Sequence, residues 1–546
     1  MKNIIGCCLC SLFLLAACID DNGNYVYREL AEIKVENVPE VIEVLGYVDH
    51  IRISPKFVSS IEGEIKADDP NYTVCYRIGY KGMGSLGGYD TVAMKSKPWV
   101  DITPKSGFDL DIPADYTPNT YCIWMTVTDN RTNAVTSKVY DVVVSSSTGE
   151  GWLVLCNEGT EERTRLDMIS RLSSTRTEPI YNVAKGMPAV HHATCMGFVP
   201  KMSNPGDVIS VFTQEEDYML DQETLESGAE LEFNLSNFMV DPGETLIKEY
   251  AFAAATYSWL MHYRFGFSEA GNAYVLVGGI AGEAYGMPIN TLSPGTPAKF
   301  RVAPYAGYSW VRPWQTTYAA NVLFYDIDNQ RFVIFKGETN FGTAELCMFP
   351  ISDLTENRLF SYITGKDMVY MEGTRRSNGL VYAVLQNAEG KRSLYGINMG
   401  GKDPVQELYI DEINAPDIEK ATHFAFHSQF PLMFYAVNNK LYLYNVGTKQ
   451  AKLMTAVNLG ASEEITQIKF NLYRNGVYTA LSNQSEEFMT KQYELIVSSY
   501  DNAGEGVNNG KVTFYRVDGV ANNITKTEEY AGFAKVVDVV YRERAQ

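Results

Sequence analysis

The stretch Phe533-Ala-Lys-Val-Val-Asp-Val-Val-Tyr541 is an apolar run near the end of the 546-residue chain, and no hairpin partner follows it. Far earlier in the chain, Gly151-Trp-Leu-Val-Leu-Cys156 is a second apolar run, and no inner strand precedes it. Nearly continuous apolar runs are typical of strands packed on both faces. Pairing the two runs in one sheet leaves neither with an unpaired edge. This predicts a ring of sheets in which the last strand completes the sheet that starts after Gly149.

Between these two runs, hairpin units recur at intervals of about 45 to 70 residues, the mark of a β-propeller. The units are DVISVFTQ with DYMLD (207–221), NAYVLVGG (272–279), NVLFYDIDNQRFVIF (321–335), GLVYAVLQNAEGKRSLYGINM (379–399), PLMFYAVNNKLYLYNV (431–446), and YELIVSSYD with KVTFYRVDG (493–519). Six units and the composite sheet predict a seven-bladed propeller over residues 148–546, with eight blades as the alternative. No WD or kelch signature is present.

The segment before the propeller alternates apolar and polar residues with a period of two. The runs AEIKVENV, DHIRISPKFV, YTVCYRIGY, YCIWMTVTDN and SKVYDVVVSS lie between Leu30 and Ser147. Several short strands separated by turn residues predict a β-sandwich over residues 30–147. The run Ser145-Ser-Ser-Thr-Gly149 is the clearest linker in the chain. The fold class is therefore all-β, with a sandwich followed by a propeller.

The amino terminus has the layout of a secretory signal peptide. Ile4 to Ala17 is apolar, follows Lys2 and is too short to span a bilayer. Leu15-Ala-Ala-Cys18 resembles a bacterial lipobox, which implies cleavage after residue 17 and a diacylglycerol on the sulfur of Cys18. Asp20-Asp21 resembles the acidic signal with which Bacteroidetes-type lipoproteins reach the outer cell surface. We expect residues 1–17 to be the leader, 18–29 a lipidated tether, and the mature protein to be held at the outer membrane by lipid.

The sandwich segment resembles an immunoglobulin-like domain of the PKD type. The resemblance rests on Asp115-Tyr-Thr-Pro-Asn-Thr-Tyr121 leading into Ile123-Trp-Met-Thr-Val-Thr-Asp129, although Asn119 stands where the family has glycine. A sandwich and a propeller behind a lipobox together resemble the PKD-like surface lipoproteins encoded beside Sus-type nutrient importers. The resemblance implies a non-enzymatic accessory role beside a TonB-dependent barrel transporter and its solute-binding lipoprotein. The implied ligand is a peptide or an oligosaccharide.

Five cysteines remain after the leader and Cys18 are set aside, and they contain no CxxC pair. If Val74, Tyr76 and Ile78 face the core, Cys75 faces outward. The same alternation turns Cys122 outward. The two thiols then either form a cross-strand disulfide or act as two separate small hydrophobic residues.

The net charge is −20 over the full chain, which makes nucleic acid an unlikely partner. The densest acidic stretch, QEEDYMLDQETLESGAELE (214–232), lacks the spacing of a calcium loop and is interpreted as a solvated hairpin and turn. Asp326-Ile-Asp-Asn329 lies between two apolar runs and is interpreted as a hairpin turn.

No catalytic motif is present: the sequence has no HExxH, no Gly-x-Ser-x-Gly and no Walker loop. His423 and His427 lie four apart on an expected strand, about 13 Å from each other by strand rise, so they do not share a metal. The sequence assigns no catalytic residue, no metal ligand and no cofactor. A surface glycoside hydrolase, lyase or peptidase with its active site in the propeller is the alternative function, and an adhesin is a third.

One segment favours ligand binding. Tyr305, Tyr308, Trp310, Arg312 and Trp314 occur within eleven residues that also contain three turn-formers. On a propeller loop such rings can stack on sugars or hold apolar peptide side chains, while Arg312 reads a carboxylate. The alternative is a long loop between blades whose rings are buried.

Overall fold

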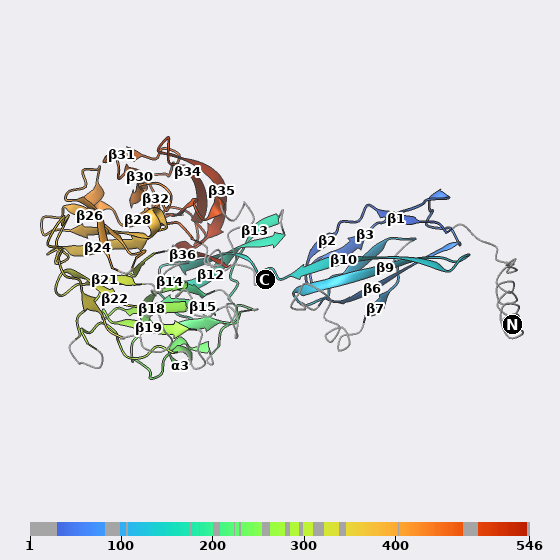
Figure 1. The fold of residues 1–546 in the computed structure, drawn as a ribbon, viewed down its shortest axis with the longest axis horizontal. Helices are drawn as coiled ribbons and strands as arrows, with labels where there is room; N and C mark the ends of the chain where they lie inside the picture. Colours follow the sequence, from blue (N-terminus) through green and yellow to red (C-terminus); the bar gives the residue numbers. More distant parts are fainter. Residues whose placement is uncertain are drawn as a thin grey trace, which may run out of the picture. The chain divides into compact units, whose positions relative to one another are not determined.

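A computed structural model of the chain describes residues 30–81, 99–104, 107–173, 176–184, 186–199, 208–222, 224–228, 231–253, 262–278, 284–293, 299–309, 321–337, 346–401, 403–472 and 490–542. The chain divides into two compact units, Met1–Ser146 and Ser147–Gln546 (Figure 1). Both are built almost entirely from strands. Among the described residues, no helix is long and apolar enough to cross a bilayer.

Within its described residues, the first unit contains ten strands in three sheets. The strands are β1 (Ile33–Glu36), β2 (Val41–Leu45), β3 (His50–Ile53), β4 (Lys56–Ser59), β5 (Gly63–Glu64), β6 (Tyr72–Tyr80), β7 (Val100–Ile102), β8 (Leu110–Pro113), β9 (Asn119–Asp129) and β10 (Ala134–Ser145). Their order is β2-β10-β9-β6-β7 in the largest sheet, with β1-β4-β5 and β3-β8 as the others. Strands β2 and β10 run parallel, and β9 pairs antiparallel with both β6 and β10.

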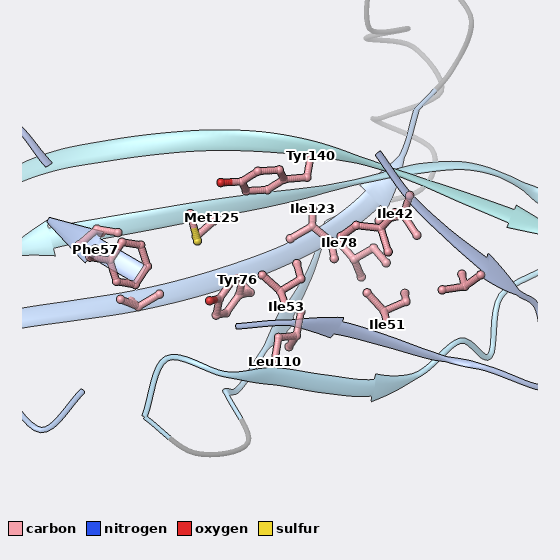
Figure 2. Close-up of a cluster of buried hydrophobic side chains, with 14 of the residues drawn as sticks. Ile42, Ile51, Ile53, Phe57, Tyr76, Ile78, Leu110, Ile123, Met125 and Tyr140 are labelled. Carbon is pink, nitrogen blue, oxygen red and sulfur yellow. The ribbon is translucent and has the colours of Figure 1, made fainter. Parts of the chain in front are cut away.

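Alternate residues of these strands form one core. Tyr76 and Ile78 on β6 and Ile123 and Met125 on β9 are buried, as the alternation predicts. Figure 2 shows Ile53 from β3 in the same layer as these side chains. The PKD-like sandwich expectation agrees with this all-β unit, in which apolar side chains from several sheets pack on one another.

The second unit has seven sheets among the described residues. The strands of the first three are β11 (Gly151–Glu158), β12 (Arg163–Ser173), β13 (Arg176–Ile180), β14 (Ala193–Val199), β15 (Val208–Thr213), β16 (Tyr218–Leu220), β17 (Leu246–Ala253), β18 (His262–Ser268) and β19 (Ala273–Gly278). The middle two sheets contain β20 (Gly307–Tyr308), β21 (Val322–Asp326), β22 (Arg331–Phe335), β23 (Phe349–Pro350), β24 (Asp367–Gly373), β25 (Leu380–Gln386), β26 (Arg392–Asn398) and β27 (Val405–Ile410). The last strands are β28 (His423–Phe426), β29 (Leu432–Val437), β30 (Lys440–Asn445), β31 (Gln450–Leu453), β32 (Glu463–Lys469), β33 (Leu495–Asp501), β34 (Gly510–Asp518), β35 (Asn523–Phe533) and β36 (Lys535–Arg542). Short helices are α3 (Phe233–Asn237), η2 (Arg376–Asn378) and η3 (Ile418–Lys420).

The strand order identifies a propeller-like unit. Six sheets are formed by consecutive strands, and each contains one of the six predicted hairpin units. The seventh sheet has the order β13-β12-β11-β36, so the last strand pairs with the first strand of the unit. In Figure 1 the red strand β36 lies among the teal strands that start the second unit, in keeping with its pairing with β11 and its contacts with β14.

The predicted tail run is divided between two strands. Phe533 ends β35, and β36 starts at Lys535 after Ala534. Trp152 is opposite Tyr541 in the register of β11 and β36. The pairing between the two apolar runs is therefore present.

The acidic stretch 214–232 is not fully solvated, contrary to the prediction. Asp217 is buried and accepts backbone hydrogen bonds from Thr213 (3.1 Å) and Leu246 (2.6 Å). Burial raises the pKa of this carboxyl to about 8. Asp326 lies at the end of β21, as predicted for the hairpin, and its carboxylate accepts a hydrogen bond from the backbone N–H of Asn329.

Candidate functional site

In each of the seven sheets of the second unit, we call the end strand that meets the end strands of the other sheets the innermost strand. These seven strands line one cavity of about 690 Å³. We call it the shared cavity. Its walls come from β14, β17, the segment leading into β20, β24, β28, β32 and β36. Neighbouring innermost strands contact one another, for example β36 with β14 and β14 with β17. Cavities of about 300–1,000 Å³ are typical of small-ligand sites.

One wall of the shared cavity is aromatic. It consists of Tyr250 on β17, Tyr305 ahead of β20 and Tyr370 on β24. The Tyr305 and Tyr370 rings meet edge to face, with centroids 5.5 Å apart. The Tyr305 hydroxyl donates to the carbonyl of Val369 at 2.9 Å. This bond and ring contact hold the Tyr305 side chain in the wall rather than free in solvent.

Lys248 on β17 lies beside this aromatic wall. Its ammonium is 4.7 Å from the ring centroid of Tyr305 and 5.2 Å from that of Tyr250. Ring quadrupoles attract a cation at such distances. Within the described part of the chain, no carboxylate lies within ion-pair distance of this ammonium, and Glu372 is the carboxyl group that its charge acts on.

Glu372 on β24 is a partly buried carboxyl group in the same wall. Its Oε2 accepts a hydrogen bond from the backbone N–H of Phe426 (2.8 Å) and from the Tyr370 hydroxyl (3.1 Å). Burial raises the pKa of Glu372 to about 7, although these hydrogen bonds and the Lys469 and Lys248 charges oppose the rise. Near neutral pH the group therefore exists in both protonation states.

The opposite wall is ionic. Asp538 on β36 accepts hydrogen bonds from Lys469 (2.8 Å), Gln467 (2.7 Å) and the backbone N–H of Met196 (3.0 Å). Burial alone would raise the pKa of Asp538, but the Lys469 charge and these donors outweigh burial and lower it. A second pair, Lys535 and Glu464 at 2.8 Å, lies in the same wall.

Two buried acceptors in the ionic wall have no hydrogen-bond partner among the described residues. They are the Gln467 Oε1 and the Thr466 Oγ1. Buried polar atoms in proteins are nearly always paired, and atoms left unpaired in a cavity are natural contacts for a ligand or water. The shared cavity thus offers rings on one side and hydrogen-bonding groups on the other.

The sequence-predicted binding residues divide into two groups. Tyr305 and Tyr308 line the shared cavity, and Tyr308 is also buried in the apolar core beside it. Trp310, Arg312 and Trp314 lie outside the described residues, as does the predicted lipidation site Cys18.

The sequence analysis missed Lys248, Glu372 and Asp538. Each lies on a different innermost strand, so no local motif contains two of them. The only local signal is a charged residue in an otherwise apolar strand, as in LIKEYAFA (β17), DMVYMEG (β24) and KVVDVVYR (β36).

Of the two alternatives for Cys75 and Cys122, the structure has the separate residues and not the disulfide, because both thiols are free. The expectation that Cys122 faces outward is wrong. In the register of β6 and β9, Cys75 is opposite Thr126 while Cys122 is opposite Gly79, so the two sulfurs are too far apart along the strands. Cys75 is exposed, as predicted. Cys122 is fully buried, and its thiol lies 3.7 Å from the carbonyl oxygen of Gly79.

The histidines and acidic groups form no metal cluster within the described residues. His423 lies in the cavity wall, and burial lowers its pKa. His427 lies just beyond β28, where burial lowers its pKa to about 4 and its Nδ1 accepts hydrogen bonds from the backbone N–H groups of Gln429 and Phe430.

Comparison with known protein families finds a match for the first part of the chain. Residues 18–191 match the PKD-like family. The match covers the first unit and continues through β11, β12 and β13 of the second. No curated protein matches the chain.

Several solved structures align with much of this chain at low sequence identity. A quinonprotein alcohol dehydrogenase-like protein from Bacteroides thetaiotaomicron is 9% identical, with a TM-score of 0.38 and coverage of 95% of this chain and 100% of that one. A Lactobacillus plantarum protein is 9% identical, with a TM-score of 0.42 and coverage of 72% and 100%. The periplasmic gluconolactonase of Pseudomonas aeruginosa is 10% identical, with a TM-score of 0.41 and coverage of 72% and 99%. The activities in these names are properties of those proteins.

Glu372 makes the stability of the second unit dependent on pH. Its pKa rises from 4.5 in an unfolded chain to about 7 in the fold, so its contribution is complete below pH 4.5 and is lost as pH rises through 7. We expect the free energy of unfolding of the wild type, relative to Glu372→Gln, to fall by about 3 kcal/mol from pH 4.5 to pH 8. Urea denaturation of both chains across this range measures the difference. A difference that is flat or rises with pH would contradict the assignment.

Proposed function

We propose that this chain is a lipid-anchored protein of the outer cell surface that binds a ligand in its propeller-like unit and takes part in nutrient uptake. In this proposal it is a non-enzymatic accessory subunit of a Sus-type complex, beside a TonB-dependent barrel transporter and its solute-binding lipoprotein. The ligand is a peptide or an oligosaccharide. The observation that carries the binding role is the shared cavity, because every innermost strand contributes to its wall.

The architecture in this proposal is a closed propeller with seven blades. The seven sheets would be the blades, and the sheet that joins β36 to β11 would close the ring. The common cavity supports this arrangement, since sheets arranged side by side in an open row would not all contribute to one hollow.

The anchoring part of the proposal rests on the lipobox resemblance of Leu15-Ala-Ala-Cys18 and on the acidic Asp20-Asp21 behind it. The match of residues 18–191 to the PKD-like family supports the PKD-type domain that the sequence resemblance implied. Two lipid-bearing groups on one cysteine suffice for stable attachment to a membrane surface.

A surface glycoside hydrolase is the second candidate, and one observation favours it. Glu372 and Asp538 lie in one cavity, and their environments move their pKa values in opposite directions. Such pairs serve as acid and base in sugar hydrolysis. We favour binding, because Lys469, Gln467 and Met196 already occupy the Asp538 oxygens.

Gentle solubilisation of membranes tests the proposed role. We expect the full chain, carrying a carboxy-terminal tag, to be recovered together with a large outer-membrane barrel, and the amino-terminal peptide to carry acyl chains on Cys18. The Cys18→Ala variant is expected to lack the acyl chains and to be missing from purified outer membranes.

The tagged full chain recovered from these membranes also tests whether the protein is a glycoside hydrolase. The non-enzymatic role predicts that the wild type releases no product from glycans that it binds. Turnover that Glu372→Gln abolishes would favour the hydrolase. Recovery of the wild-type chain without any barrel under all growth conditions would refute the uptake role.

A further inference from the structure

The shared cavity has two unlike walls, and this asymmetry restricts what it can hold. The rings of Tyr250, Tyr305 and Tyr370 form the first wall, while the second presents Gln467 and two ion pairs. A sugar ring fits such a pair of walls, because its C–H face packs on an aromatic ring and its hydroxyl groups hydrogen-bond at the edge.

The charges of the cavity wall point to an anionic sugar. Lys469 is paired with Asp538 and Lys535 is paired with Glu464, at 2.8 Å in each case. Lys248 differs from both, since its ammonium lies between two rings and forms no ion pair within the described residues. A partly buried ammonium gains most from a partner anion, and a ligand can supply that anion.

Resting on the binding role proposed above, we propose that the shared cavity binds a sugar that carries one carboxylate, with the carboxylate at Lys248 and the ring face on the tyrosines. One unpaired cation matches one negative charge, which favours a uronic or sialic acid unit over a doubly charged phosphate ester. The cavity of about 690 Å³ is large enough for more than one sugar unit.

Glu372 supplies a second, testable feature of this site. Glu372 lines the cavity, and because its Oε2 accepts both hydrogen bonds, Oε1 is the oxygen left to carry a proton. The protonated form can donate to a bound carboxylate, whereas the ionised form repels it. The pKa of Glu372 is about 7 in the free protein, so carboxylate binding is coupled to proton uptake near neutral pH.

Other charged and titratable groups lie around Glu372 in the cavity wall. They are Lys248 and Tyr250 on β17, Tyr305 ahead of β20, Tyr370 on β24, His423 on β28, Lys469 on β32, and, facing Tyr250, Cys195 on β14 and Asp538 on β36. Burial lowers the pKa of His423 below its usual value. Burial raises the pKa values of the tyrosines and of Cys195 above the neutral range, and that of Asp538 lies below it. Glu372 is therefore the group among them that titrates near pH 7.

Calorimetric titration of the full chain in detergent tests the proposal. The probes are galacturonate and sialyllactose, each with one carboxylate and each compared with its methyl ester, which has the same ring but no charge. We expect at least one acid to bind at pH 6 about tenfold more tightly than its ester, and its affinity to fall about tenfold from pH 6 to pH 8.

Two variants and a control sharpen the test. Lys248→Met is expected to weaken binding of the acid about tenfold and to leave binding of the ester unchanged. Glu372→Gln is expected to keep the affinity seen at pH 6 and to remove the pH dependence. Lys391→Met is the matched control, because Lys391 is exposed and pairs with Glu412 outside the cavity.

If an acid and its ester bind equally, or if neither acid binds, the proposal of an acidic sugar ligand is wrong. The uptake role is tested separately, by the copurification experiment. Tight binding of an acid by a protein that never copurifies with a barrel supports the ligand and refutes the uptake role. An affinity for the acid that Lys248→Met does not change overturns the placement of the carboxylate.

Discussion

A chain that ends at Ala534 is expected to lose the cooperative unfolding transition of its second unit. The deletion removes β36, whose side chains Val536, Val539 and Tyr541 are almost completely buried. Each contributes about 1.5–3 kcal/mol by burial, and a typical domain has only about 5–15 kcal/mol in total. The deletion also exposes one edge of β11 along its whole length.

Fluorescence of Trp152 during thermal unfolding measures this effect. The indole lies 4.9 Å from the Tyr541 ring and 5.0 Å from the Phe514 ring, between centroids, so its environment depends on β36. A chain that ends at Arg542 is the control and is expected to unfold as the wild type does. A shortened chain with the wild-type transition would show that the last strand does not close the proposed ring.

Replacement of Arg264 by leucine is expected to destabilise the second unit by about 3–5 kcal/mol, because it leaves a buried carboxylate without its charge partner. The Arg264 Nε donates to Glu249 Oε1 at 2.8 Å, and both side chains are almost inaccessible to solvent. The same guanidinium donates to Asn237 at 3.0 Å and lies over the rings of Phe233 and Tyr285.

Arg301→Leu is the matched control for this variant. Arg301 also forms a close ion pair, with Asp328 at 2.7 Å, but the two side chains are 64% and 37% exposed. Exposed pairs contribute about 1 kcal/mol or less, so we expect little change. Urea denaturation measures the free energy of unfolding of both variants. Similar losses of stability in Arg264→Leu and Arg301→Leu would contradict the expectation that burial makes the Arg264 pair the more important one. Adding Glu249→Gln to Arg264→Leu is expected to recover part of the loss.

The strands of this protein are predictable because their signals are local. NVLFYDIDNQRFVIF contains both arms of a hairpin and its turn, and the structure has β21 and β22 there. The pairing of β36 with β11 is a long-range feature, yet it was predictable because each run lacks a neighbouring partner in the sequence.

The site was predictable only in part, for a physical reason. Tyr305 and Tyr308 lie in one aromatic segment, and the segment itself indicated binding. Lys248, Glu372 and Asp538 become neighbours only when separate innermost strands meet. The disulfide alternative fails for the same reason: alternation gives the face of a strand, whereas a disulfide also depends on register, which places Cys122 opposite Gly79.

The sheet that joins the two ends of the second unit also sets the timing of folding. The Tyr541 hydroxyl donates to Glu150 across 391 positions of the chain. Closing a loop of that length costs about 5 kcal/mol in chain entropy before any contact repays it. On the proposed route through the envelope the amino terminus emerges first, so β11 waits for its partner until synthesis and export are complete. A stalled or clipped nascent chain would therefore present an unpaired strand edge to its neighbours.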